Sequence, residues 1–236
     1  MPKAVDLEQL WKFYGDYPAL RHITASVEEG SCCALLGRNG AGKTTLLRIL
    51  AGLSPFQRGT VRTFGNTPRS DASRRQLGFL GHGAGVYDDL TARENLLFFA
   101  QICELKNESQ VARTWLERVG LERAAEMPVR QFSRGMRQRL ALARAFLNAP
   151  TLLLLDEPFT SLDDRAIRIL NELLSEARAR GATIVLSTHQ LHEALTIASH
   201  VAVLENGKLR YSGERTPEML ADTTLLYRID MEVGAA

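Results

Sequence analysis

Three short stretches of the chain are apolar at nearly every position, with no alternation between apolar and polar residues. They cover residues 31–36, 151–155 and 182–187, and turn-forming or polar residues flank each of them. Uninterrupted apolar runs of this length are typical of strands that are buried on both faces of a parallel sheet. The pattern therefore predicts three such strands.

Helical periodicity follows two of these strands. The sequence predicts helices over about 43–53 and 164–180, and the second ends at a glycine. Residues 1–65 are rich in strand-like patterns, and Asn206-Gly207 predicts a hairpin turn near the other end of the chain. Strand, helix and strand in succession indicate a parallel α/β sheet.

Between these α/β segments, residues 88–148 have helical periodicity. Thr91 and Glu94 have the spacing of a capping box, which opens a helix. Gly120 follows a second helix, whose apolar residues are Val111, Trp115, Leu116 and Val119. We therefore expect a helical subdomain at 83–148, inserted into a core made of residues 1–82 and 149–236.

Composition places the chain among ordinary globular proteins. Of its 236 residues, 45% are hydrophobic and 24% charged, which excludes a disordered chain, a collagen and a disulfide scaffold. The 29 basic and 27 acidic side chains leave a formal charge of +2, too little for a tight electrostatic grip on nucleic acid. No apolar run has membrane-spanning length, and acidic residues interrupt the N-terminus where a secretory signal would be apolar, so we expect a cytosolic protein.

The three cysteines are too few for a disulfide framework. Cys32 and Cys33 are adjacent in an apolar run, and Cys103 lies among helical residues. Because no C-x-x-C or Cys/His spacing is present, we expect all three to be thiols of the core.

The strongest chemical motif lies between the first buried strand and the helix that follows it. Its sequence fits the phosphate-binding pattern G-x-x-x-x-G-K-[ST] and reads Gly37-Arg38-Asn39-Gly40-Ala41-Gly42-Lys43-Thr44. The glycines let backbone N–H groups wrap phosphates, and the helix N-terminus adds partial positive charge. Lys43 is expected to reach the β- and γ-phosphates, and Thr44 to offer its hydroxyl to Mg²⁺. A plain glycine-rich turn would not explain the Lys-Thr pair between a strand and a helix.

Two consecutive carboxylates end the second buried strand. Asp156 and Glu157 follow residues 152–155, and Pro158 breaks the strand. In a parallel sheet this strand end faces the same edge as the phosphate-binding loop. Because side chains alternate along a strand, we expect Asp156 to face the magnesium shell and Glu157 to face an attacking water. These residues predict a nucleoside triphosphatase.

A further segment indicates which class of nucleotide-binding protein the chain is similar to. A predicted helix upstream of the acidic strand opens with Phe132-Ser133-Arg134-Gly135-Met136. Here the sequence resembles the ATP-binding subunits of ABC transporters, whose signature motif is usually Leu-Ser-Gly-Gly-Gln. The match holds at Ser133 and Gly135 and departs at the other three positions. By itself, Ser133 is equally typical of a helix N-cap.

The resemblance covers nearly the whole chain and implies a fold. That fold is an α/β P-loop NTPase core of the RecA-like type, with an N-terminal antiparallel β subdomain and an inserted α-helical signature subdomain. ATP and Mg²⁺ are the implied cofactors. The nucleotide-binding residues that the resemblance assigns are Tyr14, Gly37, Arg38, Asn39, Gly40, Ala41, Gly42, Lys43, Thr44, Thr45, Ser133, Gly135 and Asp163. Among them, Tyr14 would stack on adenine and Asp163 would belong to the D-loop.

Catalytic roles and assembly follow from the same resemblance. Glu157 is expected to be the general base, and His189 matches the switch histidine that holds water and the γ-phosphate in line. Thr44, Asp156 and His82 are expected around the metal. In that family two subunits form a head-to-tail dimer that sandwiches two ATP molecules, so this chain would pair with a second copy or with a paralogue. The phosphate-binding loop of one subunit would face Ser133 and Gly135, or their equivalents, in the other.

His82 departs from the family pattern, because most members carry a glutamine at this position in the Q-loop. Two interpretations remain: an imidazole nitrogen replaces the glutamine oxygen near the metal and its water, so that His82 acts in catalysis, or His82 is a solvated loop residue. Together with Gln190, which follows the switch histidine, His82 makes the chain look most like the haem-exporter ATP-binding subunits of cytochrome c maturation.

The resemblance also implies partners. The chain would be a peripheral subunit on the cytoplasmic face of the cell membrane, powering a separate transmembrane permease. Val86, Tyr87 and Thr91 are candidates for the permease contact, while Val86 and Tyr87 fit equally well inside the helical subdomain. The alternatives are the ATPase of a drug, lipid or ion exporter, and a soluble ABC ATPase without a transport role. The soluble ABC ATPase lacks support because neither a long coiled coil nor a second cassette is present.

Overall fold

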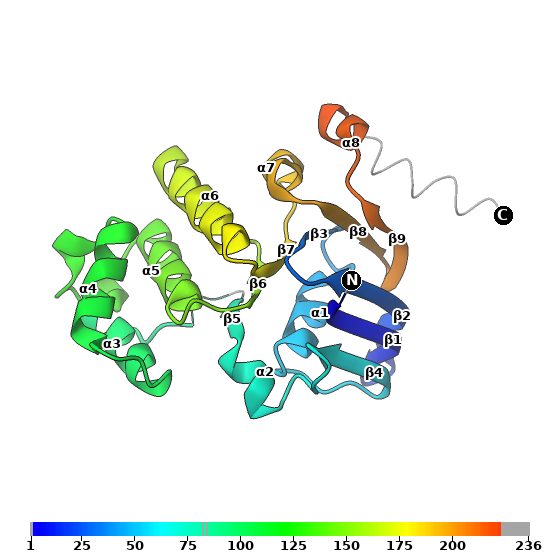
Figure 1. The fold of residues 1–236 in the computed structure, drawn as a ribbon, viewed down its shortest axis with the longest axis horizontal. Coiled ribbons are helices and arrows are strands. Elements are labelled where there is room, and N and C mark those ends of the chain that lie inside the picture. The colour runs from blue at the N-terminus through cyan, green and yellow to red at the C-terminus, as the bar shows by residue number, and fades with distance from the viewer. Residues whose placement is uncertain (1, 82, 84, 223–236) are drawn as a thin grey trace.

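Two β-sheets form the centre of the molecule, for which the computed structural model describes residues 2–81, 83 and 85–222 (Figure 1). The smaller sheet is antiparallel, with the order β2-β1-β4, and its strands are β1 (Lys3–Tyr14), β2 (Tyr17–Glu28) and β4 (Arg58–Thr63). The larger sheet has the order β5-β6-β7-β3-β8-β9, and all neighbours are parallel except the final pair. Its strands are β3 (Cys32–Leu36), β5 (Leu77–Leu80), β6 (Leu152–Asp156), β7 (Thr183–Ser187), β8 (His200–Glu205) and β9 (Lys208–Glu214).

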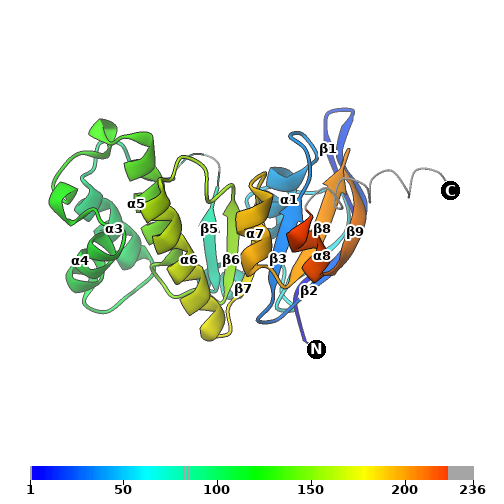
Figure 2. The same ribbon diagram turned by 90° about the horizontal axis from the view of Figure 1, so that it is seen from above.

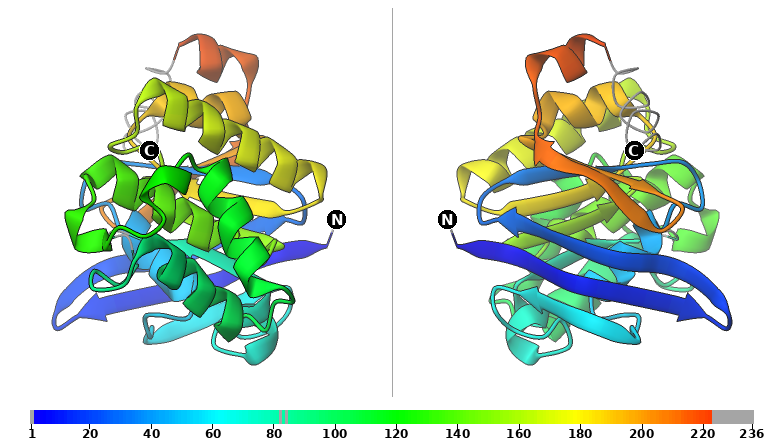
Figure 3. Two further views of the ribbon diagram at one scale, coloured as in Figure 1. Left: turned by 90° about the vertical axis from the view of Figure 1, so that its left-hand side faces the viewer. Right: turned by 90° about the vertical axis from the view of Figure 1, so that its right-hand side faces the viewer.

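Both faces of the larger sheet are covered, which explains why its central strands are apolar throughout. In β3, Cys33 and Leu35 belong to a cluster with α1 (Lys43–Leu50) and the antiparallel sheet. The alternate residues of the same strand belong to a second cluster, beneath α6 (Asp164–Ala179) and α7 (Leu191–Ile197). Figure 2 shows α6 and α7 in front of the larger sheet, on the same face of it. The long antiparallel strands run across the opposite side of the molecule, as the right panel of Figure 3 shows.

A third hydrophobic cluster lies among α3 (Ala92–Ile102), α4 (Glu108–Arg118) and α5 (Arg134–Phe146), which stand in front in the left panel of Figure 3. The predicted capping box at the start of α3 is present, with both reciprocal hydrogen bonds. Short 3₁₀ turns at Glu122–Ala124 and Val129–Gln131 connect α4 to α5. Because α5 contributes Leu140 and Ala143 to this cluster but Phe146 to the cluster under α6, it joins the helical part to the sheet.

The predicted fold class is confirmed: a parallel α/β core, an antiparallel β part and an inserted group of helices are all present. Several details differ from the expectations. The first predicted helix ends at Leu50 instead of residue 53, since Gly52 has φ +71° and turns the chain away. Two short helices, α2 (Asp71–Arg75) and α8 (Pro217–Ala221), were not predicted. Within the described ranges no helix is both long and apolar enough to cross a bilayer.

The prediction for the cysteines is right at two positions and wrong at the third. Cys32 and Cys33 are buried, and burial raises the pKa of each thiol to about 12, so neither is a thiolate at neutral pH. Cys103 is exposed at the C-cap of α3, one residue past the end of the helix, and does not belong to the helical cluster.

Candidate nucleotide-binding and catalytic site

The phosphate-binding loop connects the end of β3 to the start of α1, as the sequence predicted. Gly37 and Gly42 have φ values of +146° and +109°, which are unfavourable for residues with a side chain. There is also no room for one: a Cβ at Gly37 would lie 2.2 Å from the Leu204 carbonyl oxygen, and one at Gly42 would lie 2.7 Å from Leu20 Cδ2. Gly42 is the N-cap of α1 and offers no side-chain acceptor, so the first N–H groups of this helix stay available to an anion.

The Lys43 ammonium lies inside the curve of this loop. Its Nζ donates to the carbonyl oxygens of Gly37 and Arg38, at 2.7 and 3.2 Å. Burial lowers the pKa of Lys43 below its usual value, while the charges of Glu157 and Asp156 oppose that shift. The lysine therefore forms hydrogen bonds to the loop at the position where phosphates bind in proteins with this motif.

Asp156 is the buried end of β6, and it is held from two sides. Thr44 Oγ1 donates to Asp156 Oδ2 at 2.7 Å, and Ser187 Oγ donates to Asp156 Oδ1 at 2.5 Å. Asp156 and Ser187 are paired residues on the neighbouring strands β6 and β7. A threonine hydroxyl beside a carboxylate, next to a phosphate-binding loop, is the donor set that holds Mg²⁺ in P-loop NTPases, so these residues fit the metal.

Glu157 and His189 are in direct contact. The distance from His189 Nδ1 to Glu157 Oε2 is 2.8 Å, and the backbone N–H of His189 donates to the same oxygen at 3.3 Å. Glu157 has a left-handed backbone with φ +53°, and its own N–H donates to the Ser187 carbonyl oxygen. The chain thus turns abruptly after β6, and the carboxylate of Glu157 has other partners than that of Asp156, although both line the same groove.

An open groove of about 750 Å³ connects these groups to the antiparallel sheet. The predicted residues Asn39, Gly40, Ala41, Gly42, Lys43, Thr44 and Thr45 line it together with Asp156, Glu157, Tyr14 and Tyr17. Tyr14 is 51% exposed, and the Lys12 ammonium lies 4.5 Å from its ring centroid. Tyr17 was not predicted, although it is also exposed and lies just across the β1–β2 turn. An exposed aromatic ring at one end and phosphate-binding groups at the other suit a nucleotide.

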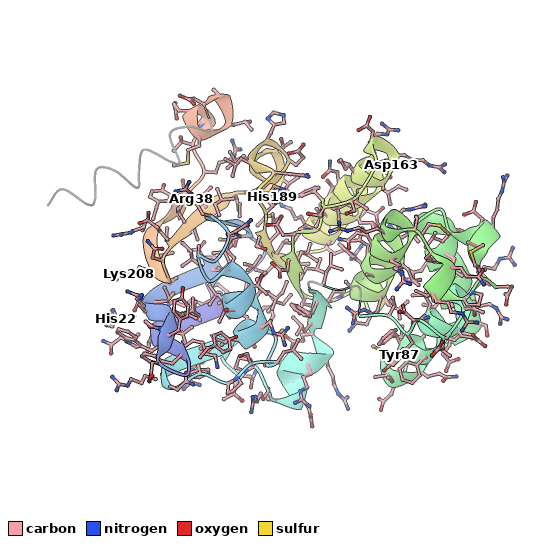
Figure 4. The ribbon with its side chains drawn as sticks, turned by 180° about the vertical axis from the view of Figure 1, so that it is seen from behind. His22, Arg38, Tyr87, Asp163, His189 and Lys208 are labelled. Atoms are coloured by element: carbon pink, nitrogen blue, oxygen red, sulfur yellow. The ribbon has the colours of Figure 1, made fainter. Side chains whose placement is uncertain are left out.

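The other predicted site residues lie elsewhere. Arg38 lines a separate cavity of about 250 Å³ with His189 and Glu205, and Figure 4 shows Arg38 and His189 at neighbouring positions. Ser133 and Asp163 are the N-caps of α5 and α6, where their side chains accept from the N–H groups of Met136 and Ala166. Ser133, Gly135 and Asp163 are not among the described residues that line the groove. His82 lies outside the residues that the structure describes.

Comparison with protein families identifies this arrangement. A model of the family described as "ABC transporter" matches residues 20–160. Bacitracin transport ATP-binding protein BcrA of Bacillus licheniformis is 38% identical over 89% of this chain and 69% of its own length. Nod factor export ATP-binding protein I of Burkholderia orbicola (strain AU 1054) is 37% identical, over 94% of this chain and 73% of its own length.

Solved structures agree with the sequence relatives. "Structure of ATP binding subunit of ABC transporter" superposes with a TM-score of 0.86 and 30% identity, covering 98% of this chain and 99% of the other. A dimeric post-hydrolysis state of the ATP-binding cassette MJ0796, bound to ADP and Pi, superposes with a TM-score of 0.82 and 27% identity. This match covers 90% of this chain and 99% of the other. The phosphate-binding loop, the acidic strand end and these likenesses lead to one conclusion: the chain belongs to the ABC transporter family and is an ATP-binding subunit with ATPase activity.

Proposed function

We propose that this subunit powers a separate membrane permease through ATP-driven closure of a head-to-tail dimer on its cytoplasmic face. The observation that carries the proposal is the Glu157–His189 contact beside the phosphate-binding loop, because a protein that only binds nucleotide has no use for a positioned base. Lys43 and the loop N–H groups would hold the phosphates of ATP. Thr44 and Asp156 would hold Mg²⁺, whose chemistry is to offset charge on the phosphates.

Glu157 would act as the general base and His189 as the residue that orients it. The two contacts from His189 to Glu157 Oε2 fix the direction of this carboxylate and leave its other oxygen, Oε1, to accept a proton from water.

The second half of each ATP site would come from another copy of the chain. Ser133 and Gly135 lie apart from the groove of their own chain, so they are free to face the phosphate-binding loop of a second copy. A solved relative, described as "Dimeric Structure of MJ0796, a Bacterial ABC Transporter Cassette", supports this assembly. Asp163, at the start of α6, would lie at the same interface.

The permease would dock on the aromatic surface formed by Tyr87 and Phe98. Their rings meet edge to face at 5.1 Å, and they are 50% and 37% exposed. The buried side chain of Asn95 bonds to both the N–H and the carbonyl oxygen of Tyr87 and holds this loop in place. Val86 instead packs against the helical cluster, which favours Tyr87 over Val86 as the contact residue. Figure 4 shows Tyr87 on the helical side of the molecule, away from His189.

We expect the double substitution of Tyr87 and Phe98 by alanine to reduce recovery of the permease by at least about tenfold in affinity purification from detergent-solubilised membranes. Exposed aromatic anchors each contribute about 2 kcal/mol or more to many interfaces. ATP hydrolysis by the isolated subunit should stay within about twofold, because neither ring lines the ATP groove. Alanine at Met127, which is 38% exposed and does not line the ATP groove, is the control for loss of an exposed apolar side chain. Undiminished recovery would place the permease on another surface.

The transported molecule is proposed to leave the cell, since relatives at 36–38% identity are named for bacitracin transport and Nod factor export. Haem is the candidate cargo that Gln190 and the predicted Q-loop position of His82 suggest. The test is mass spectrometry of proteins that co-purify from native membranes, combined with a haem absorbance scan. A cytochrome c maturation permease with bound haem would support haem export. A different permease would reject haem, and ribosomal proteins or DNA without any permease would reject the transport role.

A further inference from the structure

Lys12 of β1 is buried, with only 4% of its surface exposed, and none of the described hydrogen bonds or ion pairs includes its ammonium. Lys43, the other lysine that is buried in the described part of the chain, bonds to two carbonyl oxygens. The Lys12 ammonium instead lies 4.5 Å from the centroid of the Tyr14 ring, which is a cation–π contact. Because burying a charge without an anionic partner is costly, a lysine at this position indicates a role other than packing.

The ammonium approaches the Tyr14 ring from its sheltered side. Lys12 and Tyr14 share one face of β1, since side chains two residues apart in a strand point the same way. At the alternate positions, Trp11 and Phe13 stack on each other with their ring centroids 5.7 Å apart. Tyr14 is 51% exposed and lines the ATP groove, whereas Lys12 is not among the described residues that line it. One face of the Tyr14 ring is therefore covered by a cation, and the other is open to the groove.

The hairpin that carries this pair is anchored to the phosphate-binding loop. Lys12 is paired with Leu20 across the β1–β2 ladder, and Leu20 packs against Gly42 of the loop. The turn between β8 and β9 adds a second connection, because the N–H of Gly207 donates to the Ala41 carbonyl oxygen at 3.0 Å. The carbonyl oxygen of Gly207 accepts from a backbone N–H of β2 at 2.7 Å. These contacts fix the backbone of the hairpin relative to the phosphate end of the groove, and the ammonium of Lys12 restricts the ring itself.

We infer that Lys12 is a positioning residue for the base of ATP and acts through the ring of Tyr14. The inference rests on the ATPase function and on Tyr14 as the ring that stacks on adenine. The faces of aromatic rings carry partial negative charge, so a ring and a base repel each other when their faces meet. A cation on the far face draws electron density away from the open face and reduces this repulsion. It also holds the exposed ring in one orientation before ATP arrives, so that binding costs less conformational entropy.

The first test compares ATP with tripolyphosphate, which has the phosphates but no base. Lys12→Met keeps the length of the side chain and removes its charge. We expect this variant to bind ATP about three- to tenfold more weakly, the factor that a cation–π contact contributes. The KM for ATP should rise by the same factor while kcat stays within about twofold. Inhibition of the ATPase by tripolyphosphate should not change, because Lys12 does not line the groove. Lys3→Met, at the exposed start of the same strand, is the matched control.

The second test asks whether Lys12 acts through the ring. Tyr14→Ala should weaken ATP binding by itself, and adding Lys12→Met to it should cause no further loss of ATP affinity. Thermal unfolding without nucleotide measures any structural contribution of Lys12. The unfolding temperature of Lys12→Met should not fall, because methionine removes a buried charge that has no anionic partner.

Several outcomes would overturn the inference. Equal losses for ATP and tripolyphosphate would mean that the ammonium acts on the phosphates, and additive losses in the double mutant would mean that it acts without the ring. A lower unfolding temperature with an unchanged preference for ATP over tripolyphosphate would make Lys12 a structural residue. Normal ATP binding by Tyr14→Ala would place the base elsewhere. If the unaltered chain hydrolyses no ATP, even with its permease, the function on which the inference rests is itself wrong.

Discussion

Replacing Glu157 by glutamine is expected to lower the rate of ATP hydrolysis by about 10²- to 10⁴-fold, the range that a positioned general base contributes. The amide keeps the shape of the side chain but cannot take a proton from water. ATP affinity should remain, because Lys43 and the loop N–H groups hold the phosphates and Glu157 does not. Single-turnover hydrolysis with excess enzyme, together with equilibrium ATP binding, measures the two effects separately.

Two further variants make this result specific. Glu172→Gln removes an exposed carboxylate of α6 and should hydrolyse ATP at the original rate. Because His189 contacts the Glu157 carboxylate directly, the losses caused by Glu157→Gln and His189→Ala should not add in the double mutant. Additive losses would mean that the two side chains act independently, and a Glu157→Gln enzyme with more than about one tenth of the original rate would exclude Glu157 as the base.

Replacing Lys43 by alanine is expected to weaken ATP binding by about 100-fold. In the free chain its ammonium bonds to the carbonyl oxygens of Gly37 and Arg38, so ATP binding exchanges these acceptors for phosphate oxygens. Two new charge-assisted hydrogen bonds would contribute about 3–6 kcal/mol to the binding free energy of ATP. Because they replace existing bonds to the loop, we expect a loss near the lower end of this range, which corresponds to about 100-fold in affinity. Isothermal titration with ATP measures the affinity.

The control for lost positive charge is Lys106→Ala, an exposed position between α3 and α4. Thermal unfolding without nucleotide should shift little in the Lys43 variant, because water can replace the ammonium at the two carbonyl oxygens. An ATP affinity within about threefold of the original would show that Lys43 does not contact the phosphates. A large loss of thermal stability would instead mean that the substitution weakens binding by disrupting the loop.

The fold and the phosphate-binding loop were predictable because their signals are local. The spacing of the glycines with Lys43 and Thr44 is enough to predict the phosphate-binding loop. The uninterrupted apolar runs are enough to predict the parallel sheet. The short strand β5 was missed, because Gly78 interrupts its pattern. That glycine is required by packing: a Cβ would lie 2.2 Å from the Ala145 carbonyl oxygen of α5. A contact between distant segments thus determines a residue that local propensity disfavours.

Within the site, side-chain partners across strands were the least predictable part. The hydrogen bond from Ser187 to Asp156 depends on β6 and β7 being neighbours in a particular register, which periodicity does not reveal. The direct contact of His189 with Glu157 depends on the sharp turn after β6. Tyr17 was missed for a similar reason, since only the β1–β2 hairpin brings it to the groove.

Because Glu157 has a left-handed backbone, the residue that suits activity at this position is not the one that gives the highest thermal stability. A non-glycine residue in this conformation costs about 1 kcal/mol, which a glycine would avoid. Glycine at 157 would therefore tend to raise the unfolding temperature while removing the carboxylate. Directed evolution that selects only for thermal stability would accumulate such inactive variants. Stabilising changes that preserve turnover should be sought in the exposed turns of the antiparallel sheet, far from this strained strand end.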